Sequence, residues 1–106
     1  MNKLFKIEAY LPCEALEKIK QGLYSHGLGR VGNYDCCLSW YKIDSSWRAK
    51  DGANPYLGEL GKIEFAPEYK LEFRCEEKDL QLATTIIKQN HPYEEVCINI
   101  LPLFVL

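Results

Sequence analysis

Long apolar runs and an excess of one charge are both missing from this sequence. No apolar stretch approaches the roughly 20 residues of a membrane-spanning helix, and the opening segment, MNKLFKIEAYLP, alternates in polarity where a signal peptide carries a continuous apolar block. The 106 residues hold 13 Lys and Arg against 15 Asp and Glu, so the net charge of -2 gives no bulk attraction to nucleic acid or to an anionic membrane. We therefore expect a cytoplasmic chain with no nucleic-acid partner and no membrane partner.

The motifs of several enzyme classes are also missing. Only two histidines occur, His26 and His91, and neither has the HxxxH spacing of a metal site on a helix. No GxSxG or P-loop string is present, and the five cysteines include no CxxC pair. These absences argue against a self-contained dinuclear metallohydrolase, a nucleophile elbow, a Walker-type site and a zinc ribbon. We expect no catalytic residue, and the length predicts one domain over residues 1–106.

Alternation of apolar and polar residues predicts the strands. Residues 3–11 alternate in this way and Pro12 ends the run, which indicates a half-buried strand. Two short alternating runs meet at Ala66-Pro67-Glu68, which we interpret as a hairpin turn. Residues 42–61 are predicted to form a long ordered loop of the kind that often carries function, with one extra edge strand inside it as the alternative. The further strands are predicted over residues 33–41, 62–66, 69–75 and 96–101.

Apolar residues at helical spacing predict two helices. The first covers residues 13–26, and Gly27 is placed as its left-handed cap. The second covers residues 76–90 and must stop near His91, because Pro92 disfavours helical backbone before it. The predicted fold class is therefore α+β, a ferredoxin-like split βαβ of order βαββαβ with two helices on one face of an antiparallel sheet.

The end of the chain is unusually apolar. Residues 102–106 read PLFVL. An exposed apolar tail is unfavourable in water, so we expect the body of the protein or a second subunit to cover it.

Residues 27–32, GLGRVG, satisfy the GxGxxG string of dinucleotide-binding folds. In those folds a strand precedes the glycines and a helix follows, so that free N–H groups point at the phosphate. Here a helix precedes and a strand follows. We interpret the glycines as a tight helix-to-strand turn, with Arg30 leaving room for a small anionic ligand.

A histidine and two carboxylates stand together in residues 91–95, HPYEE. This donor set suits a divalent metal or acid–base chemistry, whereas a histidine at a helix end also suits the carbonyls of its own helix. Cys13 is a candidate further ligand, because it and His91 lie at strand–helix junctions that this fold brings to one end of the sheet. A thiolate with an imidazole favours copper or zinc.

Three segments are notable for their order and spacing: residues 27–36 (GLGRVGNYDC), 52–58 (GANPYLG) and 91–96 (HPYEEV). Together they resemble the inserted domain of Nif-three-like proteins of the YqfO type, over nearly the whole chain. The resemblance implies a CutA/PII-like fold, whose members commonly assemble as trimers. It also implies that the metal-dependent hydrolase activity attributed to the longer relatives, labelled as a GTP cyclohydrolase type, depends on metal ligands in the domains that flank the insert. The CutA likeness of the HPY turn implies a divalent metal at His91, with Cys13 and Glu95 beside it.

Three hypotheses result. The first is a non-enzymatic, homo-oligomeric binding or regulatory domain, with a trimer favoured and a small anionic ligand where residues 27–33 approach residues 91–95. The second is a CutA-like copper or zinc protein that uses Cys13, His91 and Glu95, and the third is a purely structural oligomerisation module. No cofactor other than such a metal is expected. The expected ligand-binding residues are Gly27, Gly29, Arg30, Gly32, Asn33, Tyr93 and Glu94.

Overall fold

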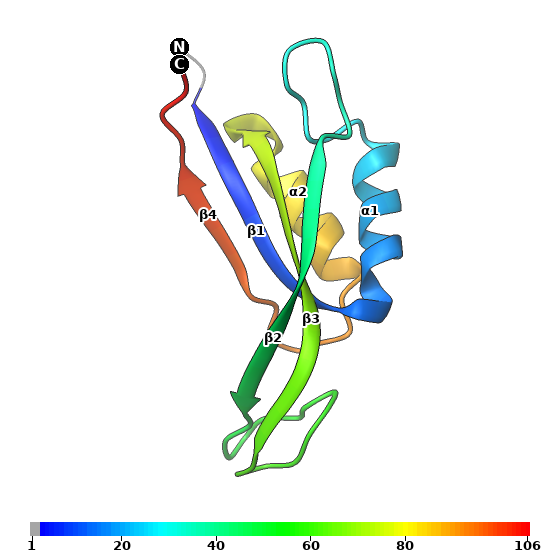
Figure 1. The fold of residues 1–106 in the computed structure, drawn as a ribbon, viewed down its shortest axis with the longest axis vertical. Coiled ribbons are helices and arrows are strands. Elements are labelled where there is room, and N and C mark those ends of the chain that lie inside the picture. The colour runs from blue at the N-terminus through cyan, green and yellow to red at the C-terminus, as the bar shows by residue number, and fades with distance from the viewer. Residues whose placement is uncertain (1–2) are drawn as a thin grey trace.

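A four-stranded antiparallel sheet with two helices on one face makes up residues 3–106, the part of the chain that the computed structural model describes (Figure 1). The spatial order of the strands is β2-β3-β1-β4. The predicted α+β class and βαββαβ order are therefore confirmed. The elements are β1 (Leu4–Pro12), α1 (Leu16–Ser25), β2 (Leu38–Arg48), β3 (Ile63–Glu76), α2 (Leu80–Gln89) and β4 (Ile98–Pro102), with short 3-10 helices at Cys13–Ala15 and Glu77–Asp79.

The core lies between the helices and the two central strands. Ile7 pairs with Phe73 and Ala9 with Leu71 across β1 and β3, so their side chains share one face of the sheet. This face packs on the apolar sides of α1 and α2, as the alternation and the helical spacing predict. The fully buried large side chains are Ile7, Leu11, Ile19, Leu23, Leu28, Leu71 and Ile87.

The C-terminus of α1 has the predicted cap. Gly27 has a φ of 61°, and its N–H donates to the carbonyl of Tyr24 at 3.0 Å. The next N–H, from Leu28, donates to the carbonyl of Leu23 at 3.1 Å. This pair of bonds is a Schellman motif, which glycine favours because it adopts positive φ without a Cβ penalty.

The predicted hairpin turn at Ala66-Pro67-Glu68 is wrong, because β3 runs without a break through Pro67. Pro67 pairs with Asp44 of β2, whereas on its other side β1 ends opposite Glu68. A proline lacks the N–H that a central strand needs, but it is tolerated where a strand has lost one neighbour. The true hairpin joins β2 to β3. We call residues 42–67, which form its projecting end, the hairpin arm (Figure 1).

Two further predictions differ from the structure. The strand expected over residues 33–41 starts only at Leu38, since residues 28–37 fold back on themselves through a Val31–Tyr34 bridge. It then continues to Arg48, because residues 42–48 pair with β3, so the loop predicted over residues 42–61 covers only the part after Arg48. The apolar tail is not covered by the body, and Phe104 keeps 93% of its surface exposed. A second subunit thus stays a prediction. No helix within residues 3–106 combines the length and the apolar content needed to cross a membrane.

Candidate functional site

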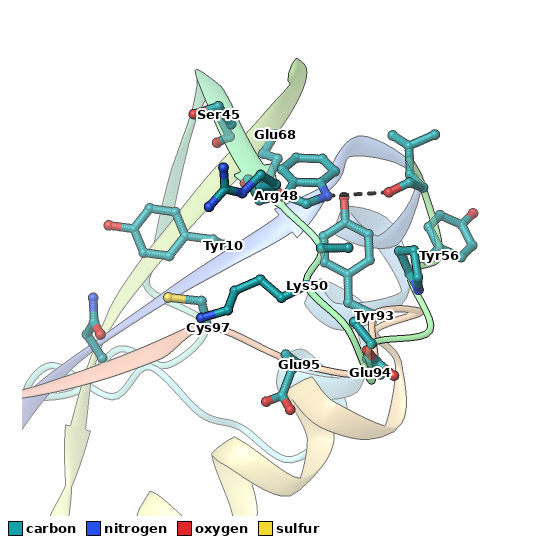
Figure 2. Close-up of a pocket in the computed structure, with 17 residues that line it drawn as sticks. Tyr10, Ser45, Arg48, Lys50, Tyr56, Glu68, Tyr93, Glu94, Glu95 and Cys97 are labelled. Atoms are coloured by element: carbon teal, nitrogen blue, oxygen red, sulfur yellow. Dashed lines mark hydrogen bonds between the residues drawn. The ribbon is translucent and has the colours of Figure 1, made fainter. Parts of the chain in front are cut away.

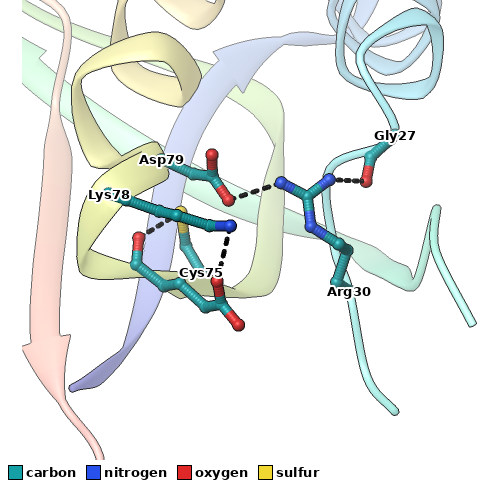
Figure 3. A network of polar contacts seen from close by, with 6 residues as sticks. Gly27, Arg30, Cys75, Lys78 and Asp79 are labelled. Atoms are coloured by element: carbon teal, nitrogen blue, oxygen red, sulfur yellow. Dashed lines mark hydrogen bonds and ion pairs between the residues drawn. The ribbon is translucent and has the colours of Figure 1, made fainter. Parts of the chain in front are cut away.

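The two segments expected to meet at a ligand site lie at opposite ends of α2. Arg30 donates to Asp79, directly before α2, at 2.6 Å, and to the carbonyl of Gly27, also at 2.6 Å (Figure 3). His91 follows the other end of this ten-residue helix, about 15 Å away at 1.5 Å per residue. Residues 27–33 therefore do not approach residues 91–95.

The glycine segment itself forms a compact turn. A Cβ on Gly29 would stand 2.9 Å from the backbone nitrogen and oxygen of Cys37, so this glycine permits a close backbone approach. Gly32 and Asn33 are exposed. With Arg30 engaged by Asp79 and by a carbonyl, the segment has a structural role in holding the turn against α2.

His91 is buried, and both of its ring nitrogens have partners. Nε2 donates to the carbonyl of Tyr10 at 2.8 Å, and Nδ1 accepts from the backbone N–H of Tyr93 at 3.2 Å. Burial lowers the pKa of His91, against the opposing effect of its bond to the Tyr10 carbonyl. The imidazole is therefore neutral, with its free lone pair already used, and it ties the turn after α2 to the end of β1.

A metal does not fit the residues expected to hold one. His91 has no lone pair to offer, and the thiol of Cys13 faces the carbonyl of Pro67 at 3.7 Å. Glu95 is exposed on the next turn. Across residues 3–106, no group of three or more His, Cys, Asp or Glu side chains is arranged to hold a metal ion. The Cys13, His91 and Glu95 set is thus not brought together.

A cavity of about 590 Å³ lies where the hairpin arm meets the body, beside the turn that His91 holds (Figure 2). The arm contributes residues 45–50 and part of the loop that follows. The body contributes the end of β1, Glu68 of β3 and the chain that leads into β4. The lining residues are Tyr10, Ser45, Ser46, Trp47, Arg48, Ala49, Lys50, Ala53, Pro55, Tyr56, Leu57, Glu68, Tyr93, Glu94, Glu95, Cys97 and Asn99.

Aromatic rings form one wall of the cavity around Tyr93. The ring centroids of Trp47 and Tyr56 lie 5.8 Å and 5.6 Å from that of Tyr93, both tilted, and the His91 ring lies 4.9 Å away, edge-on. Such spacings are favourable for aromatic pairs. Burial raises the pKa of the Tyr93 phenol to about 12, and the charge of Glu68 acts in the same direction. The phenol is therefore neutral near pH 7.

Three hydrogen bonds hold the arm's loop over the cavity. The backbone N–H of Asn54 donates to Glu94 at 2.8 Å, and the Tyr56 hydroxyl donates to Glu14 at 3.0 Å. Within the arm, the indole of Trp47 donates to the carbonyl of Leu57 at 3.3 Å. Two carboxylates of the body thus anchor a loop that lies about 40 residues away in sequence.

Arg48 and Lys50 line the cavity without a carboxylate partner. Neither takes part in an ion pair with any residue in the described part of the chain. Both side chains extend over the cavity toward Tyr10 and Cys97 (Figure 2). Cations without a partner beside aromatic walls are an arrangement that can bind a small anion.

Of the predicted ligand residues, Tyr93 and Glu94 line this cavity, whereas the glycines, Arg30 and Asn33 do not. Sequence reasoning missed Arg48 and Lys50. The signal available was the pattern Trp47-Arg48-x-Lys50 inside the segment predicted as a long loop, which places an aromatic residue next to two cations.

The fold is an α+β architecture, two helices on one antiparallel four-stranded sheet, that CutA and PII-like proteins share. Neighbours among solved structures are CutA from Archaeoglobus fulgidus (TM-score 0.68, 22% identity, 97% of this chain and 84% of that chain) and the GlnK–ATP complex of Bacillus subtilis (TM-score 0.68, 17% identity, 95% and 84%). A Bacillus cereus protein related to NIF3 superposes more closely, with a TM-score of 0.83 at 22% identity, over 96% of this chain and 26% of that chain. At these identities the likeness establishes the fold.

Similarity in sequence leads to the same relatives. The chain is 33% identical over 90 residues to a GTP cyclohydrolase 1 type 2 homolog of Staphylococcus epidermidis, covering 85% of this chain and 25% of that protein. A homolog of the same description from Bacillus subtilis is 32% identical over 102 residues, covering 96% and 27%. No family model matches the chain. The resemblance to Nif-three-like proteins is confirmed, and the chain spans about a quarter of the length of the curated relatives it matches.

Proposed function

We propose that this chain is a non-enzymatic binding and regulatory domain, and that a small anionic ligand occupies the cavity between the hairpin arm and residues 93–97. The observation that carries the proposal is the pair Arg48 and Lys50, which line an aromatic cavity without ion-pair partners among residues 3–106. A volume of about 590 Å³ is typical of small-molecule sites. The GlnK neighbour, described as an ATP complex, supports the use of this fold as a domain that binds a small molecule.

The absence of catalysis is part of the proposal. The curated relatives are named for GTP cyclohydrolase activity, but this chain corresponds to about a quarter of their length. Of the two histidines in residues 3–106, His91 lies beside the cavity wall, and both of its ring nitrogens are bound to backbone groups, which leaves it no nitrogen for proton transfer. We expect homogeneous protein to leave GTP unchanged when the mixture is followed by chromatography. Consumption of GTP that disappears in Lys50→Gln would contradict this part of the proposal.

We further propose that the chain works as a homo-oligomer, for which the CutA and PII resemblance favours a trimer. Large apolar side chains are exposed on the arm and the tail, with Phe65 at 73% and Phe104 at 93%. The sheet also has two free edges, at β2 and β4, whose unpaired backbone groups favour association. Sedimentation analysis tests the oligomeric state directly, and a monomer at all concentrations would contradict it.

The ligand proposal is tested by NMR titration with a panel of small anions: acetate, inorganic phosphate, benzoate and AMP. We expect at least one of them to shift the amide signals of Trp47, Arg48 and Tyr93. The double variant Arg48→Gln/Lys50→Gln should lose this response. Lys62→Gln is the matched control, because Lys62 lies on the same arm but pairs with Glu59 outside the cavity. If no anion moves the cavity signals, the proposed function is wrong.

A further inference from the structure

We infer that the ligand of this cavity is a planar aromatic or heteroaromatic acid with one negative charge, and not a polyphosphate. This inference rests on the proposed function and specifies its ligand. It follows from three properties of the cavity: the balance of charges that line it, the absence of phosphate-binding backbone, and the position of the cations relative to the rings.

The charge balance of the lining disfavours a polyanion. Two cations, Arg48 and Lys50, and three carboxylates, Glu68, Glu94 and Glu95, line the cavity. Glu94 already accepts the N–H of Asn54, and Glu68 is only 6% exposed, so neither carboxylate can turn away from the cavity without breaking local structure. The three carboxylates of the lining would repel each of the several negative charges of a polyphosphate. The single charge of a ligand carboxylate can instead be neutralised by the two cations.

The backbone around the cavity lacks the usual phosphate cradle. Polyphosphates are commonly held by glycine-rich loops and by the N–H groups of helix N-termini. No glycine and no helix N-terminus lies among the residues that line the cavity in the described chain. The glycine segment 27–32 is at the far end of α2, where Arg30 is already bound to Asp79.

The geometry of the wall favours a flat, mostly apolar ligand. Trp47, Tyr56 and Tyr93 present rings to the same cavity, and the neutral phenol of Tyr93 adds no charge. Arg48 and Lys50 extend from the arm over the same cavity, Arg48 toward Tyr10 and Lys50 toward Cys97 (Figure 2). A ring packed on the aromatic wall would therefore place an acid substituent near the two cations.

The two tryptophans offer a built-in reporter and control. The Trp47 indole N–H lies at the cavity and donates to Leu57, so a bound ligand should shift its NMR signal. Trp40 is outside the cavity lining, with the Lys20 ammonium 3.9 Å from its ring centroid. A shift of Trp47 without a shift of Trp40 therefore identifies binding at this cavity.

The experiment compares three probes by calorimetry and by the two indole signals. Indole-3-acetate is the planar acid, indole-3-acetamide is its uncharged counterpart, and ATP is the polyphosphate. We expect indole-3-acetate to shift the Trp47 signal and to bind at least about tenfold more tightly than either of the others. In Arg48→Gln/Lys50→Gln the acid should weaken to the level of the amide, while the amide binds as before. Lys62→Gln should leave all three affinities unchanged.

The outcomes separate this inference from the function on which it rests. Equal binding of acid and amide, or ATP binding as tightly as the acid, would overturn the inference while leaving a ligand-binding cavity. If none of the three probes shifts Trp47, the inference is also wrong. The proposed function is wrong as well only if none of the four small anions shifts the amide signals of Trp47, Arg48 and Tyr93.

Discussion

The helix-covered part of the sheet and the hairpin arm share strands β2 and β3, but they differ in how deeply the side chains of these strands are buried. From Leu71 onward, β3 alternates buried and half-buried residues, and Leu71 and Phe73 pack under the helices. Before Glu68, none of its residues is buried, and Phe65 is 73% exposed. A single strand thus serves the core with one half and an accessible surface with the other. Stability should therefore depend on the covered part, and binding and association on the arm.

The largest expected effect is a core truncation in the covered part. Leu71→Ala removes a side chain that is fully buried between β1, β3 and the helices, so the free energy of unfolding should fall by about 2–5 kcal/mol in urea denaturation. Phe65→Ala, on the same strand but in the arm, should change it by less than about 0.5 kcal/mol at low protein concentration. Equal losses for the two variants would refute the division between covered part and arm.

A smaller effect is expected from the turn that follows α1. Gly29→Ala forces a residue with a φ of +78° to carry a Cβ that would stand 2.9 Å from the Cys37 backbone, and we expect a loss of about 2 kcal/mol or more. Gly32→Ala is the control, because its φ is +58° but nothing lies within 4 Å, so only about 1 kcal/mol should be lost. Thermal unfolding of both variants checks this. If both variants lose the same free energy of unfolding, the close approach of Gly29 to the Cys37 backbone does not affect stability.

A pH-dependent effect is expected at the boundary between the two regions, where His91 holds the turn. The pKa of His91 is lowered in the folded chain, so the unfolded chain binds more protons as the pH falls below about 6.5. The contribution of His91 to the free energy of unfolding should therefore be fully present above that pH. It should decrease as the pH falls from about 6.5 toward the lower pKa of the folded chain. His91→Gln should flatten this part of the profile, because it removes the group whose pKa differs between the folded and unfolded chains. Identical profiles for wild type and His91→Gln would show that the imidazole is not buried in its neutral form.

The smallest effect on the fold is expected at the tail, where association should respond instead. Deleting residues 103–106 removes the exposed Phe104, together with the bond from the Leu103 N–H to the carbonyl of Leu4 at 2.9 Å. We expect a loss below about 1 kcal/mol in unfolding, but a lower assembly state in light scattering. Phe104→Ser keeps the backbone bond and serves as the milder variant. Unchanged assembly in both would count against an interface at the tail. A lower assembly state without any ligand response at the cavity would favour the purely structural alternative.

The covered part was predictable because its local patterns and its packing agree. Period-2 alternation in β1 and helical spacing in α1 and α2 select the residues that are buried. Gly27 and Pro92 also mark the helix ends correctly, since each imposes a backbone restriction of its own. In such segments, the neighbours in sequence carry most of the information about the structure.

The arm was predicted less well, because its structure depends on which strand lies beside it. Pro67 has the local signature of a turn, yet it continues a strand because β1 ends opposite the residue that follows it. The long loop was noted as a candidate for function, but its partners Glu14 and Glu94 lie 42 and 40 residues away from the loop residues they bind. No local pattern specifies contacts of that range.

The sequence by itself determined the βαββαβ order, the faces that form the core and the likeness to a segment of Nif-three-like proteins. Short-range periodicity specifies the first two, and the order of three motifs specifies the third. Only the tertiary structure decided the site. It separated the glycine segment from the HPYEE turn by the length of α2, and it used both nitrogens of His91 to fasten that turn to β1. It also brought Trp47 against Tyr93 and placed Arg48 and Lys50 along the same cavity. Side chains so far apart in sequence meet only when the path of the whole chain has been set by the packing of its core.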